Sequence, residues 1–345
     1  MIYNIQCSIS IYQISKTLLL LVVFICFSSC SNNHDSPKVT FYYWKTEFKL
    51  SQSEKEVLKS NNVETLYIRY FDIGLKDNTP IPIAPIHFIQ KPEMHIVPVV
   101  YIKNEVLVSS VNVQKLSQDI IKLIQDISNY HQLTYQEIQL DCDWTLESKF
   151  NYFKLINLCK KLSNKIISST IRLHQVKFSS RTGIPNVDKG VLMYYNMGKI
   201  SADTLNSIYE RDIAIRYIKK LSQYPLELNI ALPIYSWGIH IRNNRVIGLI
   251  NKIKKKSFIT DTNFTLIQHN ILLTKNSILK SGFFFKKGDR IKIESISKLD
   301  IETMIGDLSD HVKTPPKEII FFDLDDNNVD GYNYGPVFQK MCNSF

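Results

Sequence analysis

The segment at positions 137–145, Glu-Ile-Gln-Leu-Asp-Cys-Asp-Trp-Thr, places two carboxylates in a stretch that otherwise reads as an apolar strand. Side chains alternate between the two faces of a strand, so Asp141 and Asp143 share one face with Gln139. Burying a carboxylate without a partner costs several kcal/mol, so these acids indicate a polar cleft in which charge is used. An exposed edge strand with one wet face is the alternative that this pattern leaves open.

Strand-like and helix-like segments alternate from residue 39 onward, which indicates a parallel sheet. We expect strands at 39–44, 65–71, 96–101, 137–145, 169–174, 191–195, 226–232 and 319–324, and helices at 51–60, 112–130, 148–162 and 208–221. This pattern favours an α/β fold of the (β/α)8 TIM-barrel type over an open doubly wound sheet. The interval from about 239 to 298 breaks the rhythm and contains a hairpin pattern around Lys287-Gly288. It is predicted to be a small β-containing insertion between strands 7 and 8.

Barrel enzymes place their sites at the carboxyl ends of the strands, and these ends carry acids, bases and aromatic rings here. Such residues suit a sugar, because its CH faces stack on rings and its hydroxyl groups need directed hydrogen bonds. The candidate catalytic residues are Asp141 and Asp143. The candidate substrate-binding residues are Trp44, Glu47, Arg69, Asp72, Trp144, His174, Tyr194, Tyr195, Tyr235, Trp237, Asp323 and Asp325. Taken singly, each aromatic residue is better explained by core packing.

Three short motifs resemble the barrel of the family 18 glycoside hydrolases. They are Leu140-Asp141-Cys142-Asp143-Trp144, Met193-Tyr194-Tyr195 and Leu232-Pro233-Ile234-Tyr235-Ser236-Trp237. The first and last together are most similar to an uncharacterised bacterial family of secreted proteins and lipoproteins with a glycoside-hydrolase-like barrel. The resemblance would cover about residues 39–334. It implies a protein that binds or processes a polysaccharide or another glycan.

The chitinases of that family follow the Asp-x-Asp pair, two residues on, with a catalytic Glu, and this sequence has Thr145 there. Threonine cannot act as a general acid toward a glycosidic oxygen, so hydrolysis does not follow from the resemblance. We predict Asp143 as the acid or base, Asp141 as a buried charge that tunes it, and Arg69 or His174 as its partner. The carboxylates that could replace the missing acid are Glu47, Asp72, Glu147, Asp323 and Asp325.

Two classes of function therefore stay open: an enzyme with an atypical acid, and a non-catalytic glycan-binding or scaffold protein. A metal-dependent hydrolase is disfavoured, because only His174 lies near the acids in the predicted arrangement. Residues 326–331 resemble the opening of a calcium loop, but Val337 stands where an EF-hand needs a bidentate glutamate. A solvated turn is the preferred interpretation of that segment. We predict neither a metal nor a cofactor.

The first thirty residues carry a targeting signal. Residues 17–27 are an unbroken apolar run, shorter than the roughly 20 residues that span a membrane. The following Phe27-Ser28-Ser29-Cys30 resembles the lipobox of bacterial lipoproteins, in which the cysteine is acylated and becomes the N-terminus. We expect a signal peptide over 1–29, a tether over 30–38 and the barrel domain over 39–345. The expected location is the bacterial cell envelope, anchored through Cys30, with the outer membrane favoured over ordinary secretion.

The chain has 345 residues and a net charge of +10, of which removal of residues 1–29 leaves +9. A surplus of this kind suits anionic glycans or lipid headgroups, and no motif indicates nucleic acid. After Cys30 the only thiols are Cys142, Cys159 and Cys342. Their odd number and irregular spacing argue against a disulfide framework.

Overall fold

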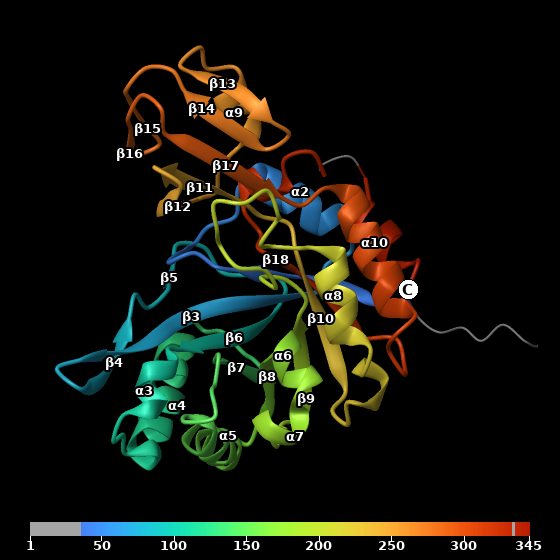
Figure 1. Ribbon diagram of the computed structural model, residues 1–345. Coiled ribbons are helices and arrows are strands. Elements are labelled where there is room, and N and C mark those ends of the chain that lie inside the picture. The colour runs from blue at the N-terminus through green and yellow to red at the C-terminus, as the bar shows by residue number, and fades with distance from the viewer. Residues whose placement is uncertain (1–35, 333–334) are drawn as a thin grey trace, which may run out of the picture. The chain divides into compact units, whose positions relative to one another are not determined.

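A closed barrel of eight parallel strands forms the centre of the molecule (Figure 1). The computed structural model describes residues 36–332 and 335–345, and Ser36–Phe345 form one compact unit. The barrel strands are β1 (Lys38–Tyr43), β3 (Thr65–Lys76), β6 (His95–Ile102), β7 (Glu137–Asp141), β8 (Ile166–Arg172), β9 (Lys189–Met193), β10 (Leu228–Pro233) and β18 (Glu318–Phe322). Strand β1 pairs with both β3 and β18, which closes the sheet. The predicted (β/α)8 fold is confirmed.

Helices cover the outside of most of the barrel. They are α2 (Gln52–Ser60), α3 (Asn104–Val108), α4 (Val113–Tyr130), α5 (Lys149–Ser163), α6 (Leu173–Lys177), α7 (Ser179–Thr182), α8 (Arg211–Ile218), the 3-10 turn η1 (Leu221–Gln223), α10 (Lys298–Ser309), α11 (Asp326–Val329) and α12 (Val337–Cys342). Capping boxes start α2 at Ser51 and α10 at Ser297. On α4, Leu116, Ile120 and Ile124 recur every four residues and are buried.

The chain between β3 and β6 forms no helix. Strand β4 (Thr79–Ile83) folds back on β3, and β5 (His87–Phe88) pairs with β2 (Glu47–Phe48). Four prolines between residues 80 and 92 explain this, because proline removes a helix hydrogen bond and clashes with the preceding turn.

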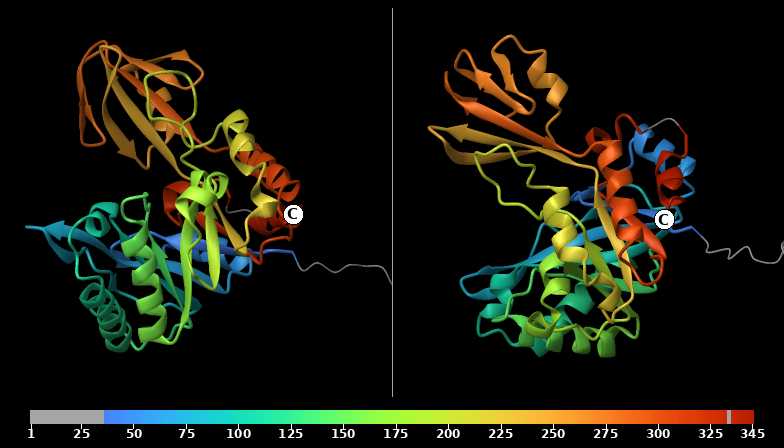
Figure 2. Two further views of the ribbon diagram at one scale, coloured as in Figure 1. Left: turned by 60° about the horizontal axis from the view of Figure 1, so that its bottom comes forward. Right: turned by 45° about the vertical axis from the view of Figure 1, so that its right-hand side comes forward.

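The predicted insertion between the seventh and eighth barrel strands is confirmed (Figure 2). Its strands are β11 (Ser236–Arg242), β12 (Arg245–Asn251), β13 (Phe264–Gln268), β14 (Ile271–Thr274), β15 (Ile278–Lys280), β16 (Phe283–Phe285) and β17 (Arg290–Ser295), and its helix is α9 (Lys255–Ile259). Five of the strands form an antiparallel sheet in the order β12-β11-β17-β14-β13. The insertion also has a small apolar core of its own, which includes Phe258, Phe264 and Phe285.

The hairpin predicted around Lys287-Gly288 is wrong. Strand β16 pairs with β15 through a turn at Ser281-Gly282, where both residues have a positive φ, and β17 pairs instead with β11 and β14. Gly288 also has a positive φ and turns the chain, but the strands on its two sides belong to different sheets. The turn at Gly288 could be recognised in the sequence, whereas the partners of the flanking strands depend on long-range pairing.

The side chains of strand β7 alternate between the inner and the outer side of the barrel, as predicted. It lies between β6 and β8, all five of its residues are buried, and it is therefore no edge strand. Gln139 accepts a hydrogen bond from the Tyr42 hydroxyl of β1 at 2.6 Å, on the inner side of the barrel. The Tyr152 hydroxyl of α5 contacts the Leu140 carbonyl oxygen from the outer side at 3.0 Å.

Within the described residues no helix is both long enough and apolar enough to cross a bilayer. The predicted signal peptide, Cys30 and the tether up to residue 35 lie outside the described residues.

Candidate functional site

A cleft of about 480 Å³ opens at the carboxyl ends of the barrel strands. Seven of the predicted site residues line it: Trp44, Asp72, Asp141, Tyr195, Tyr235, Trp237 and Asp323. Eight further residues complete the lining: Tyr101, Arg172, Met193, Asn196, Ser236, Asn251, Lys252 and Phe322. The barrel therefore brings together side chains that lie up to 279 positions apart, between Trp44 and Asp323.

Asp141 lies at the base of the cleft and is 6 % exposed. Its carboxylate accepts a hydrogen bond from the Thr170 hydroxyl of the neighbouring strand at 2.7 Å. Burial and the neighbouring Asp143 raise the pKa of Asp141 to about 6, although the Thr170 hydrogen bond opposes the shift. This carboxyl group can therefore hold a proton close to neutral pH.

Asp143 forms a two-point ion pair with Arg172, in which Nε and one Nη each bind one carboxylate oxygen. The register explains the partner, because Leu140 lies opposite Ser169 in the parallel pair β7–β8. Three residues further along each strand, Asp143 and Arg172 reach the same height. Both oxygens of the Asp143 carboxylate are therefore occupied by the guanidinium in this arrangement.

Arg69 or His174 was predicted as the partner of Asp143, and this geometry corrects that prediction. Arg69 pairs instead with Asp72 at 2.6 Å and donates to the Ala84 carbonyl oxygen at 3.1 Å. His174 lies on α6, two residues beyond the end of β8. Burial of its ring and the nearby Arg172 lower the pKa of His174.

Asp323 is the second buried acid of the cleft, and its peptide bond to Phe322 is cis. Burial raises the pKa of Asp323 to about 6, although Lys252 opposes the shift. The Asn328 side-chain amide donates to the Asp323 carboxylate at 2.5 Å. Asp141 and Asp323 are thus two cleft acids without an ion pair to a lysine or arginine of the described residues.

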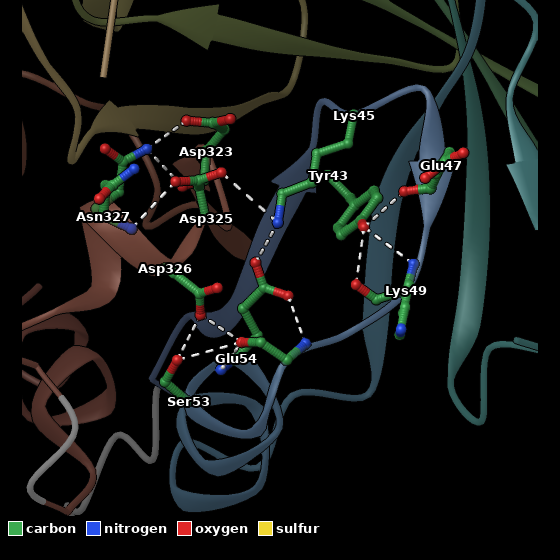
Figure 3. A network of polar contacts seen from close by, with 12 residues as sticks. Tyr43, Lys45, Glu47, Lys49, Ser53, Glu54, Asp323, Asp325, Asp326 and Asn327 are labelled. Atoms are coloured by element: carbon green, nitrogen blue, oxygen red, sulfur yellow. Dashed lines mark hydrogen bonds and ion pairs between the residues drawn. The ribbon is translucent and has the colours of Figure 1, made fainter. Parts of the chain in front are cut away.

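A polar network beside the cleft joins the chain after β18 to the chain after β1 (Figure 3). Lys45 lies between Glu54 at 2.5 Å and Asp325 at 3.5 Å. Asp325 also pairs with Lys252 of the insertion at 2.8 Å. Burial alone would raise the pKa of Asp325, but its bonds to Lys252 and to the Asn327 amide keep it below the usual value.

In the segment that resembled a calcium loop, the acids bind side chains of other parts of the protein. It forms the short helix α11, and Asp326 accepts hydrogen bonds from the Ser51 and Ser53 hydroxyls. Asp330 pairs with Lys254 of the insertion at 2.6 Å. In the described part of the chain, no three His, Cys, Asp or Glu side chains are grouped so as to hold a metal ion.

Aromatic rings form a continuous surface on one side of the cleft. Phe322 contacts Trp44, Tyr195 and Tyr235, with ring centroids 5.4, 5.7 and 5.8 Å apart. Trp237 continues the row, 5.4 Å from Tyr235. The Tyr235 hydroxyl contacts the side-chain oxygen of Asn196 at 2.5 Å, which fixes the ring at the rim.

Trp237 is held by a buried ion pair of the insertion. Its indole N–H donates to Glu294 at 2.7 Å, and the Ser207 hydroxyl donates to the same oxygen. The other oxygen of Glu294 pairs with Lys292 at 2.8 Å, and both side chains are fully buried. Lys292 also donates to the Leu205 carbonyl oxygen at 2.9 Å. The insertion and the loop after β9 therefore position one ring of the cleft together.

Comparison of the sequence with profiles of known protein families finds no match, and neither does comparison with curated proteins. Solved structures are similar in fold. The C-terminal domain of a putative chitinase from Desulfitobacterium hafniense aligns with a TM-score of 0.55 at 10 % identity, over 89 % of this chain and 100 % of that domain.

Two further structures align over 89 % of this chain, with TM-scores of 0.50 at 12 % identity. One is the spore cortex-lytic enzyme SleL of Bacillus cereus, of which 74 % is covered. The other is a family 18 chitinase of Cycas revoluta, as a double mutant with bound (GlcNAc)4, of which 98 % is covered. The fold of the barrel is similar to that of the family 18 chitinase. At these identities the likeness concerns the fold alone.

Seven predicted residues do not line the cleft, of which two flank it. Trp144 is buried against Tyr152 outside the barrel, with ring centroids 5.2 Å apart, and Tyr194 lies near Tyr209, also outside. Trp144 follows Asp143 and Tyr194 precedes Tyr195, and both of these neighbours face the lumen. Because successive side chains alternate between the two faces, Trp144 and Tyr194 point outward. The others are Glu47, exposed on β2, Arg69 and His174. Asp143 and Asp325 flank the cleft through their partners Arg172 and Lys252.

Tyr101 and Arg172 are not among the predicted site residues, although both lie toward the ends of predicted strands, where barrel sites are built. Burial raises the pKa of Tyr101 to about 12, which keeps its hydroxyl proton available to a ligand. Asn251 and Lys252 come from the insertion, and no pattern in the sequence tells which insertion residues reach the cleft.

A second hollow of about 400 Å³ lies near the amino-terminal ends of β10 and β18, between residues 221–228 and 312–314. It contains none of the predicted residues.

Proposed function

We propose that the protein binds a glycan in the cleft at the carboxyl end of its barrel. The aromatic row of Trp44, Phe322, Tyr195, Tyr235 and Trp237 carries this proposal, since it runs beside the carboxyl groups of the cleft. Rings receive the CH faces of a sugar, and carboxylates and amides receive its hydroxyl groups. The Cycas revoluta chitinase of similar fold holds (GlcNAc)4, which supports the same class of ligand here.

Binding is favoured over hydrolysis by the state of Asp143. Gln139, Asp141 and Asp143 follow one another on the inner side of β7, whereas Thr145 is exposed beyond the strand, where its N–H donates to the Ser148 hydroxyl at 2.9 Å. The family pattern has its acid two residues later, at the exposed Thr145, so the outermost residue that faces inward is Asp143. Arg172 occupies both oxygens of this carboxylate, so a general acid is lacking at that position.

Hydrolysis by another acid is the second candidate function. Asp141 and Asp323 both line the cleft, and burial raises the pKa of each to about 6. A carboxyl group that is protonated near neutral pH can protonate a leaving glycosidic oxygen. Asp141 is the first choice, because it belongs to the same row of inward-facing acids.

A paired screen separates the two functions. The unit Ser36–Phe345, free of the N-terminal segment, is tested for binding and for release of reducing ends across polysaccharides and cell-wall oligosaccharides. Trp237→Ala should weaken binding by about tenfold or more, since a buried ring contact is lost. Phe150→Ala is the matched control, because Phe150 is 75 % exposed on α5 and lies outside the cleft.

The outcomes are distinct. Binding without release supports the binding function, whereas release that Asp141→Asn abolishes while binding persists supports the enzyme. A protein that neither binds nor cleaves any glycan contradicts the proposal. The same holds for binding that Trp237→Ala leaves unchanged.

We also propose that the protein is lipid-anchored to the cell envelope through Cys30, with the outer membrane as the expected membrane. The support is the apolar run of residues 17–27 followed by Phe27-Ser28-Ser29-Cys30. Expression of the full chain with a labelled fatty acid should label the wild type and leave Cys30→Ser unlabelled. A membrane-bound but unlabelled wild type would contradict acylation.

A further inference from the structure

The insertion carries almost all of the chain's net positive charge. Residues 236–295 contain twelve Lys and Arg against three Asp and Glu, a net charge of +9, while the whole chain has +10. The rest of the chain is therefore close to balance, at +1. Like charges confined to sixty residues repel one another, so this surplus is unfavourable for folding and indicates a negatively charged partner.

The hairpin β15–β16 exposes two large apolar side chains on this basic module. Leu279 and Phe284 lie opposite each other across the hairpin and are 70 % and 54 % exposed. Arg242 of β11 donates to the Phe284 carbonyl oxygen at 3.4 Å, which fixes the hairpin beside the five-stranded sheet. Single exposed apolar residues are ordinary on a protein surface, but a cross-strand pair beside clustered lysines is not.

Three exposed lysines stand where the hairpin joins the sheet. The Lys287 amide donates to the Ser277 hydroxyl at 3.0 Å, and the Gly288 amide donates to the Thr274 carbonyl oxygen at 2.9 Å. These bonds bring Lys286 and Lys287 close to Lys275. We call Leu279, Phe284, Lys275, Lys286 and Lys287 the hairpin surface.

The lysines of the hairpin surface differ in their partners from four other lysines of the insertion. None of the three makes an ion pair with a carboxylate of residues 36–332 or 335–345. The lysines that do are Lys252 with Asp325, Lys254 with Asp330, Lys280 with Asp261 and Lys292 with Glu294. The cations of the hairpin surface are therefore available to an external anion.

We propose that the hairpin surface docks on an anionic lipid bilayer. Lysines attract anionic headgroups, and the apolar pair between them can enter the boundary between headgroups and acyl chains. A soluble polyanion would match the lysines but would leave Leu279 and Phe284 in water, so the pair favours a lipid surface. The proposal rests neither on the cleft nor on acylation of Cys30.

Vesicle sedimentation tests the proposal with the unit Ser36–Phe345, from which residues 1–35 are absent so that an acyl chain cannot contribute. Vesicles of phosphatidylcholine alone are compared with vesicles that also contain phosphatidylglycerol. The wild type should bind only the anionic vesicles, and added salt should weaken this binding. Lys286→Gln with Lys287→Gln should weaken it by about thirtyfold, since each lysine contributes about one factor of five.

Phe284→Ser tests the apolar part separately and should weaken binding by about tenfold or more. Two matched controls lie on other elements: Lys115→Gln with Lys122→Gln on α4, which removes the same charge, and Phe150→Ser on α5. Both should bind like the wild type. Thermal unfolding of every variant checks that the fold is retained.

Three results would overturn the proposal. The first is absence of binding to anionic vesicles, and the second is equal loss in the hairpin and control variants. The third is binding to soluble dextran sulfate without binding to vesicles, which would assign the surface to a polyanionic polymer instead.

Discussion

The acids at the two ends of the barrel differ in their ion-pair partners. At the amino-terminal end, Lys189 pairs with Glu137 at 2.6 Å and lies 3.5 Å from Glu318, so lysine neutralises the acids inside the barrel. At the carboxyl end, Asp141 and Asp323 have no such ion pair and line an open cleft. Burial raises the pKa of both to about 6.

This difference distinguishes acids that have a structural role from acids that are available to a ligand. The acids of the amino-terminal end also accept hydrogen bonds from Ser168, Tyr67 and Asn229, which satisfies them within the protein. The acids of the cleft are left with fewer internal partners and face a space that a ligand can fill. Four variants test this contrast, and they follow in order of decreasing expected effect.

Lys189→Met should destabilise the fold by about 3–5 kcal/mol, because it leaves the buried Glu137 and the partly buried Glu318 without their shared cation. The effect should shrink at low pH, where Glu137 becomes protonated, since burial raises the pKa of its carboxyl group. Urea unfolding measures it. Lys160→Met is the control, since Lys160 and its partner Asp188 are more than one third exposed and their pair should contribute less than about 1 kcal/mol. Equal effects of the two variants would remove the contrast.

Asp141 should make the native state less stable as the pH rises. Its pKa is about 6 when folded and near 3.8 when unfolded, so between these values the native state holds a proton that the unfolded chain has lost. Stability is therefore lost between about pH 4 and pH 6, by up to about 3 kcal/mol. Urea unfolding of Asp141→Asn across this range should show a correspondingly smaller loss.

The control for this pH dependence has the opposite sign. The bonds that Asp289 accepts from Arg242 and His240 outweigh its burial and lower the pKa of Asp289 to about 2. Its contribution is gained as the pH rises through about 2 to 4, so Asp289→Asn should lose stability at neutral pH instead. A pH profile of Asp141→Asn identical to that of the wild type would contradict the raised pKa.

Glu294→Gln should destabilise the protein by about 2 kcal/mol, because the buried Lys292 keeps only Asp203 as its charged partner. The indole N–H of Trp237 retains an acceptor in this variant, so a change in glycan affinity would report displacement of the ring. The double variant with Lys292→Met should recover part of the stability. Urea unfolding and glycan titration provide the two measurements.

Arg172→Gln should have the smallest effect on stability, about 1 kcal/mol or less, because its pair with Asp143 is partly exposed. The substitution frees the outermost acid of the row on β7. Release of reducing ends that appears only in this variant would show that the guanidinium blocks a proton donor. A loss as large as that of Lys189→Met would place Arg172 among the structural charges.

Much of the fold could be predicted because strand patterns are local. Apolar runs bounded by turns located all eight barrel strands, and the period of two placed Asp141 inside. The period of two tells which residues share a face, but not which face points into the barrel. For Tyr194 and Trp144, a position at the end of a strand did not show which face they occupy. Both residues lie next to a lumen-facing neighbour and point the other way.

The candidate site was harder to predict because it depends on pairs between strands. Arg172 binds Asp143 only because Leu140 lies opposite Ser169, a register that no local pattern states. Lys252 reaches the cleft because the insertion folds back toward Asp325. The turn at Gly288 was recognised, whereas the partners of the strands beside it were not.

The class of fold, the inward row of acids and the aromatic rings at the strand ends can be inferred from the sequence, since these follow from alternation along one strand. The folded arrangement is needed to know which acids are neutralised, which rings meet and where the positive charge is concentrated in space. Those properties depend on distances between residues far apart in the chain. Such distances are set when the barrel closes and the insertion packs against it.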